Sequence, residues 1–128
     1  MFDGKMQEKI IIFGGGGMIG SNCVKKLQER GYDVSIFDNF STYPFDMIER
    51  FGINLPLENI YVGDVRNKEE VDNSLKNKDR VVLLTSLTDV GLSIKNPQEC
   101  FDIDIIGGQN IISSFHKHKI KKIVFASS

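Results

Sequence analysis

The sequence predicts an α/β protein of the doubly wound type, in which a parallel sheet lies between two layers of helices. Two observations carry this prediction. Short apolar, β-branched runs alternate along the chain with amphipathic stretches, and the first run leads directly into four consecutive glycines. Right-handed crossovers between parallel strands place helices on both faces of such a sheet. Because 128 residues are an ordinary length for one domain, we expect a single domain over 1–128.

The first half of the chain predicts two strands, one strong helix and one weak helix. The apolar run 9–13 ends in glycines, as a buried parallel strand does. A helix is expected over 18–30 because small or apolar residues recur there at helical spacing, and Gly31 stands where a helix commonly ends in the left-handed conformation. Residues 33–37 form the second strand, and 43–51 are a weaker helical candidate.

The second half predicts three more strands and two helices. Asn67 can cap a helix, with Glu70 in the position of a capping box. Asn96 and Pro97 open a long helix with a cap residue and a proline at its first position. Gly107 and Gly108 lie inside that helix, and we expect close packing on a neighbouring helix to compensate for their cost. The remaining strands are expected at 59–63, 80–84 and 120–126.

Composition and charge exclude several functional classes. Lys and Arg number 16 against 17 Asp and Glu, so no basic stripe indicates a nucleic-acid groove. No apolar run approaches the roughly 18 residues that cross a bilayer, and 1–9 contain no apolar core of a secretion signal. Two cysteines without metal-binding spacing are typical of free thiols within helices. We therefore expect no membrane and no nucleic acid as partners, and a cytoplasmic location.

The glycine tract between the first strand and the first helix predicts a phosphate-binding loop. It satisfies G-x-G-x-x-G through Gly15, Gly17 and Gly20, and G-x-x-G-x-x-G when Gly14 replaces Gly15. A tight turn needs positive φ, a side chain would block a pyrophosphate, and the last glycine lets the helix approach the strand. A bound pyrophosphate would meet free N–H groups and the positive end of the helix dipole.

Asp38 closes the second strand about 20 residues beyond this loop, where a carboxylate accepts both ribose hydroxyls of an adenosine. Its negative charge would repel a 2′-phosphate, so this position favours NAD over NADP. The alternative interpretation of Asp38 is a turn residue at a strand end. The combination of strand, glycines, helix and acid favours the binding role, although flavodoxin-like topologies share the alternation of elements.

At this point the chain resembles the extended short-chain dehydrogenase/reductase family, specifically its NAD-dependent nucleotide-sugar epimerases and dehydratases. Residues 13–21 are similar to the family's TGGAGFIGS loop, and 38–42 to the DNLST segment of UDP-galactose 4-epimerase and its relatives. The likeness is collinear over almost the whole chain, with 62–67 similar to GDIRD, 81–86 to VVHLAA, 93–97 to SIxNP, 104–107 to NVxG and 124–128 to VYASS.

The resemblance implies a Rossmann-type, three-layer fold with strand order 3-2-1-4-5 that ends after strand five. It implies NAD at the carboxyl ends of strands one and four, with the glycine loop on the pyrophosphate, Asp38 on the ribose and Asp64-Val65 on the adenine. The full implied set is Gly14, Gly17, Met18, Ile19, Gly20, Asp38, Asn39, Ser41, Thr42, Asp64, Val65, Leu84, Thr85, Ser86 and Asp104. Departures such as Phe13 for threonine, Leu83 for histidine and Asp104 for asparagine indicate a divergent member.

In this family a Tyr-x-x-x-Lys pair moves a proton on the sugar hydroxyl, and the resemblance implies that Ser128 is the hydroxyl residue that assists it. None of the three tyrosines, Tyr32, Tyr43 and Tyr61, has a lysine four residues later. We therefore expect 128 residues that bind NAD without turnover, from a longer isomerase or lyase that acts on a nucleotide sugar. The alternatives are a stand-alone NAD(P)-binding or redox-sensing module and an interaction domain without cofactor.

Two further expectations concern the surface. His116 and His118 point to different helix faces, and with the neighbouring lysines they are typical of a solvated helix end, so no metal site is expected. A sheet that ends at strand five leaves one edge unpaired and one face of strands four and five uncovered. We therefore expect self-association, for example as a homodimer, through that edge.

Overall fold

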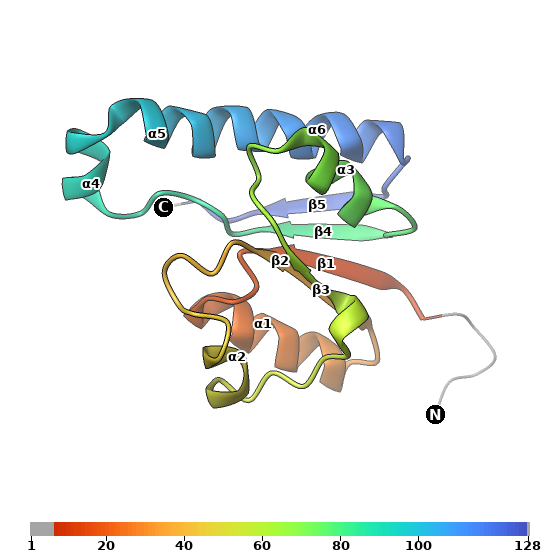
Figure 1. Cartoon of the computed structure of the whole chain (residues 1–128). Helices are drawn as coiled ribbons and strands as arrows, with labels where there is room; N and C mark the ends of the chain where they lie inside the picture. The colour runs from red at the N-terminus through yellow and green to blue at the C-terminus, as the bar shows by residue number, and fades with distance from the viewer. Residues whose placement is uncertain (1–6, 128) are drawn as a thin grey trace.

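A computed structural model of the chain describes residues 7–127 and contains one five-stranded sheet. All neighbouring strands are parallel, and their order is β3-β2-β1-β4-β5, which confirms the predicted topology. β1 is central, pairing Ile10 with Val34 on one side and with Arg80 on the other. The strands are β1 Lys9–Phe13, β2 Asp33–Asp38, β3 Ile60–Val62, β4 Arg80–Leu83 and β5 Lys122–Phe125 (Figure 1).

Helices form a layer on each side of the sheet, as the crossover rule predicts (Figure 1). One layer holds α1 Met18–Glu29 and α2 Met47–Arg50. The other holds α3 Lys68–Leu75 and a long run made of α4 Val90–Lys95, α5 Pro97–Phe101, the π-helical turn η2 Asp102–Ile106 and α6 Gly107–Lys117. A short 3₁₀ turn, η1 Leu57–Asn59, precedes β3.

Successive residues of β1 point into two separate cores, one on each face of the sheet. Ile11 and Phe13 belong to the core under α3 and α6, whereas Ile12 packs with Val24 of α1 and Ile36 of β2 in the other. Because both faces are covered, β1 contains an unbroken apolar run rather than an alternating one. The rings of Phe13 and Phe37 lie 4.8 Å apart between their centroids and join β1 to β2.

β5 lies at the sheet edge and is the most exposed strand. Its Val124 and Phe125 keep 53% and 66% of their surface exposed, whereas the apolar residues of β1 are buried. Ile123, which precedes them, packs against the core under α6. The expected unpaired edge is therefore present within the described residues, and apolar side chains line it.

Two local expectations, the helix over 43–51 and the capping box at Asn67, are only partly confirmed. Only Met47–Arg50 of the segment 43–51 is helical: a turn precedes it, in which Met47 N–H donates to Pro44 O at 2.9 Å, and Gly52 with φ +72° follows its end. Asn67 caps α3 by accepting from Glu69 and Glu70 N–H, as expected. The reciprocal half of the capping box does not form, because the Glu70 carboxylate accepts from Asp64 N–H at 2.8 Å instead.

The predicted long helix from Pro97 is interrupted, and an unpredicted helix, α4, precedes it. Asn96 makes no side-chain cap bond at Pro97, and the turn η2 is π-helical rather than α-helical. A Cβ on Gly107 would lie 2.6 Å from the Val65 side chain, which belongs to the loop before α3 and not to a helix. Gly108 faces open space, so packing compensates for only one of the two glycines.

Candidate functional site

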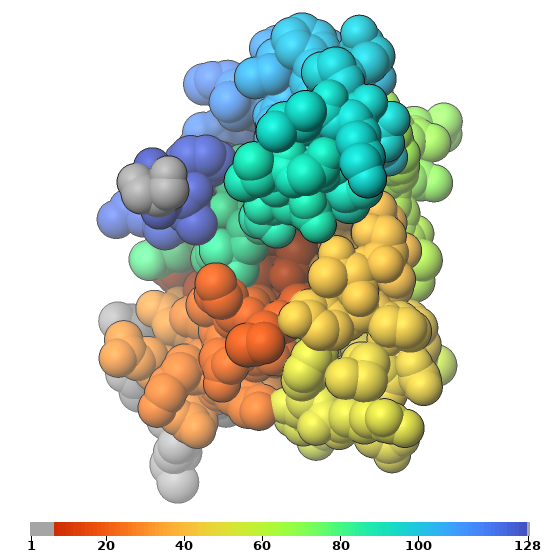
Figure 2. Space-filling model, turned by 90° about the vertical axis from the view of Figure 1, so that its left-hand side faces the viewer, coloured from red at the N-terminus to blue at the C-terminus, as the bar shows by residue number. Residues whose placement is uncertain are grey.

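The glycine loop lies at the carboxyl edge of the sheet, between β1 and α1. Gly14 adopts φ +84°, which L residues rarely adopt, and its N–H donates to Phe37 O at 2.8 Å. A Cβ on Gly20 would stand 2.4 Å from Gly14 O, so only glycine lets α1 begin this close to the loop. Figure 2 looks onto this edge and shows a recess between the start of α1 and the segment of α4 and α5.

The glycines of the tract differ in the space around them. A Cβ on Gly15 would meet Ile36 at 2.3 Å, and one on Gly16 would meet the Phe40 ring at 2.7 Å. At Gly17 the nearest atom is Gly14 O at 3.5 Å, and the backbone there is extended. Packing therefore requires most of the tract, whereas Gly17 alone borders free space at the recess.

Among the described residues, no side chain caps the N-terminus of α1. Its N-cap residue is Gly17, which has no side chain to accept the first amide hydrogens, and the first turn carries no acid. By contrast, Asn67 caps α3 and Asp89 caps α4 with their side chains. Met18 and Ile19 in this first turn are 59% and 70% exposed. The first-turn N–H groups of α1 thus remain for an external anion.

Asp38 lies directly beside the glycine loop, as its position after β2 predicts. Its carboxylate accepts from Gly16 N–H at 2.9 Å and from Phe40 N–H at 2.8 Å. Phe40 has φ +55°, and its ring packs edge-on against Phe45 at 5.1 Å between centroids. A carboxylate has about four acceptor positions, so the two hydrogen bonds leave about two of them unused within the described residues. The role of Gly16 and Phe40 in fixing Asp38 was not predicted from the sequence.

The loop after β2 presents polar groups to solvent. Asn39, Ser41 and Thr42 are all exposed there, and the Asn39 side-chain oxygen accepts from Ser41 N–H at 3.1 Å. These three residues therefore follow Asp38 on the surface of the protein, where a ligand bound at Asp38 could meet them.

Asp64 and Val65, the residues expected at the adenine, follow β3. The Asp64 carboxylate is held by Arg66, whose Nε lies 2.9 Å from Oδ1. This hydrogen bond lowers the pKa of Asp64, and partial burial opposes the shift. Val65 is buried beneath Gly107, and its carbonyl accepts from the Asn110 side chain at 2.9 Å. Both oxygens of Asp64 therefore accept from Arg66, and Val65 can contribute only main-chain groups.

The segment after β4, which begins with Leu84 and Thr85, packs against the glycine loop. A Cβ on Gly14 would lie 3.1 Å from Leu84 C and 3.2 Å from Thr85 N, so the two backbones pack directly on each other. Ser86 is exposed. Asp104 reaches this segment from η2, and its Oδ1 accepts from Leu87 N–H at 3.0 Å. The structure thus brings the expected residues of β1, β4 and η2 together at one edge of the sheet.

Ser128, the expected hydroxyl residue, lies outside the described residues. Two of the three tyrosines have partners of their own: the Tyr61 hydroxyl on β3 accepts from Lys78 Nζ at 3.2 Å, and the Tyr43 ring packs edge-on against Phe51.

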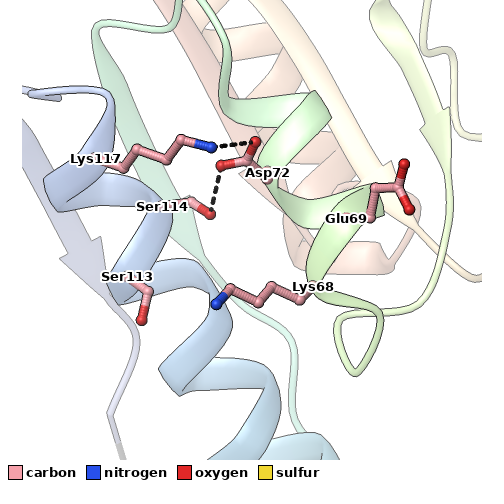
Figure 3. Close-up of a pocket in the computed structure, with 6 residues that line it drawn as sticks. All are labelled: Lys68, Glu69, Asp72, Ser113, Ser114 and Lys117. Atoms are coloured by element: carbon pink, nitrogen blue, oxygen red, sulfur yellow. Dashed lines mark hydrogen bonds and ion pairs between the residues drawn. The ribbon is translucent and has the colours of Figure 1, made fainter.

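A second cleft, of about 440 Å³, lies between α3 and α6 (Figure 3). Asp72 is its polar centre: the carboxylate accepts from Lys117 Nζ at 3.0 Å and from Ser114 Oγ at 3.2 Å, and it lies 3.0 Å from His118 Nε2. The hydrogen bond from Lys117 lowers the pKa of Asp72 most, with a further contribution from His118. The expectation of a solvated helix end is confirmed for Lys117, which stays exposed while it contacts Asp72, and is wrong for His118, whose half-buried ring lies against Asp72 of α3.

The cysteines are free and half-buried rather than fully buried. Partial burial and a contact to Asp104 raise the pKa of the Cys100 thiol. No helix within residues 7–127 has the length and apolar character needed to cross a membrane.

Comparison with known proteins identifies the relatives of this arrangement. The model of the NAD dependent epimerase/dehydratase family matches residues 10–128. A bifunctional UDP-glucose 4-epimerase and UDP-xylose 4-epimerase of Pisum sativum is 37% identical over 94% of the chain. UDP-glucose 4-epimerase of Thermus thermophilus, solved with NAD, superposes with a TM-score of 0.82 at 28% identity over 94% of the chain. The Stenotrophomonas maltophila enzyme, solved with NAD and formylated UDP-arabinopyranose, gives 0.86 at 27% identity over 95%. The chain spans 37% of the length of each of these three proteins.

Proposed function

The chain belongs to the NAD-dependent epimerase/dehydratase family, and we propose that its glycine loop binds NAD as part of a nucleotide-sugar epimerase or dehydratase. The observation that carries this proposal is the uncapped start of α1 beside Gly17, the one glycine of the tract that borders free space. First-turn amides and the helix dipole suit a pyrophosphate, and no side chain there competes with it.

The other residues of the edge fit the rest of a dinucleotide. Asp38 keeps open acceptor positions for the adenosine ribose, and its charge disfavours the 2′-phosphate of NADP. Asp64 and Val65 would border the adenine, and Asn39, Ser41 and Thr42 would border the adenosine. Leu84, Thr85 and Ser86 would line the nicotinamide end, with Asp104 behind them bound to Leu87 N–H, because β4 adjoins β1 at the point where the strand order reverses.

We propose further that these 128 residues bind the cofactor without converting a sugar. When bound, the nicotinamide supplies a site that takes up and returns a hydride. No tyrosine in the sequence has a lysine four residues later, so the proton transfer on the sugar hydroxyl lacks its acid–base pair here. Ser128 would be the hydroxyl residue of that group, and a nucleotide sugar would be the substrate of the longer protein.

Fluorescence titration of the folded chain with NADH and NADPH tests the proposal. Saturable NADH binding with at least about tenfold weaker NADPH binding supports it. A folded chain that binds neither dinucleotide contradicts it and favours the alternative of an interaction domain that has the fold without the cofactor.

A further inference from the structure

The loop between β4 and α4 is attached to the rest of the protein at two places. At its start, Leu84 and Thr85 pack against Gly14 of the glycine loop. Farther along, Leu87 N–H donates to Asp104 Oδ1 at 3.0 Å. Between residues 7 and 127, this is the only hydrogen bond that joins the segment 85–88 to another element.

Asp104, which reaches the loop, lies in a π-helical turn. η2 interrupts a run that is otherwise α-helical from Pro97 to Lys117. An i→i+5 turn adds a residue to the helix and changes which side chains face the sheet, and such turns are frequent at functional sites. The half-buried Asp104 carboxylate also lies 3.5 Å from Cys100 Sγ, one turn earlier in the same run.

We infer that Asp104 is a positioning residue, which holds the β4–α4 loop against the glycine loop through Leu87 rather than by contact with a cofactor. A hydrogen bond to a charged acceptor is among the stronger ones in proteins, and its loss would release a segment that has no other such attachment within the described residues. The effect on cofactor affinity rests on the proposed function, in which the β4–α4 loop lines the nicotinamide end of the site.

The test compares wild type with Asp104→Ala, Asp104→Asn and the control Asp102→Ala. Asp102 lies on the same turn, but the only hydrogen bond of its side chain within the described residues comes from the Gln98 side chain. Amide exchange of residues 85–88 is measured without cofactor, and NADH affinity is measured separately. If Asp104→Ala does not fold, Asp104→Ser replaces it in the test, because the shorter serine side chain does not extend as far toward Leu87 N–H.

We expect Asp104→Ala to speed exchange of the Leu87 amide by about tenfold or more and to weaken NADH binding by about five- to tenfold. Asp104→Asn keeps an acceptor oxygen but loses the negative charge, so both effects should be smaller than in Asp104→Ala, whereas Asp102→Ala should leave both properties near wild type. Unchanged Leu87 exchange in Asp104→Ala overturns the inference, even if NADH binding is lost, since that result indicates direct contact with the cofactor. The inference is also overturned if Asp104→Asn loses as much Leu87 amide protection and NADH affinity as Asp104→Ala does.

These outcomes are separable from failure of the proposed function. If wild type binds no NADH, the proposed function fails. The exchange data then still decide whether Asp104 holds the loop, because they need no cofactor.

Discussion

The carboxylate of Asp38 accepts a hydrogen bond from the main-chain N–H of Gly16 across 22 residues of sequence, at 2.9 Å. The same carboxylate also accepts from Phe40 N–H, so it joins the end of β2 to the glycine loop. Asp38 therefore has a structural role in addition to the ribose contact that we propose. Its removal should affect both the stability of the loop and the affinity for dinucleotide.

Replacing Asp38 by alanine should lower the free energy of unfolding by about 1–2 kcal/mol, because two amides lose their acceptor. The same change should weaken NADH binding by about tenfold and reduce the discrimination against NADPH. Urea denaturation and parallel NADH and NADPH titrations measure these effects. An Asp38→Ala protein with wild-type stability and wild-type preference would contradict both roles.

Glycines at two helical positions should respond in opposite directions to alanine. Gly20→Ala places a methyl group against Gly14 O, and we expect a loss of about 2–3 kcal/mol in unfolding free energy. Gly108→Ala meets nothing within 4 Å in a helix, and should stabilise the protein by about 1 kcal/mol. Thermal and urea unfolding of the two variants provide the measurement. Equal changes in unfolding free energy for Gly20→Ala and Gly108→Ala would contradict the close packing of Gly20 on Gly14.

The link between α3 and α6 should make stability depend on pH through Asp72. Hydrogen bonds from Lys117 and His118 lower the folded-state pKa of Asp72, so the stabilisation is present above the unfolded pKa and is lost as pH falls through the folded pKa. Asp72→Asn should therefore melt at a lower temperature than wild type at pH 7. The difference should shrink as the solution is acidified below the ordinary carboxyl range.

Glu69→Gln is the matched control for Asp72, since it removes a carboxylate that lines the same cleft from the same helix. Its melting temperature should stay near wild type at both pH values. If the difference in melting temperature between Asp72→Asn and wild type is the same at all pH values, the charge of Asp72 does not stabilise the link between α3 and α6.

The exposed edge of the sheet should make the 128-residue chain associate with itself. Val124 and Phe125 on β5 are more than half exposed, and the strand has unpaired main-chain groups along its outer edge within the described residues. Val124→Lys should shift the mass measured by light scattering toward monomer, because a charge on an edge strand disfavours further pairing. Monodisperse monomer for wild type at high concentration would contradict this prediction.

The sequence was sufficient for features determined by local pattern. β1, the glycine loop and α1 follow one another within 9–30, and apolar periodicity with four glycines predicts all three. Strand order followed from the family resemblance, since alternation of strands and helices fits several topologies. The segment 43–51 shows the limit of periodicity, because the pattern predicts a helix over the whole segment and only Met47–Arg50 is helical.

Features that depend on contacts between distant segments could not be predicted. The π-helical turn at Asp104 and the bond to Leu87 join residues 17 apart, and nothing in the local sequence distinguishes them from an ordinary helix. His118 likewise finds its partner Asp72 on another helix, 46 residues earlier. In both cases tertiary packing selects one of several local arrangements.

The free space beside Gly17 is where we propose that the pyrophosphate of NAD binds, and parallel NADH titrations of wild type and Gly17→Ala test this placement. An alanine methyl fits the protein there, with its nearest neighbour at 3.5 Å, so unfolding free energy should change by less than about 1 kcal/mol. The account predicts saturable NADH binding by wild type and at least about tenfold weaker binding by Gly17→Ala at nearly unchanged stability. Equal NADH affinity in the two folded proteins would contradict it, because the pyrophosphate could then not lie against the start of α1.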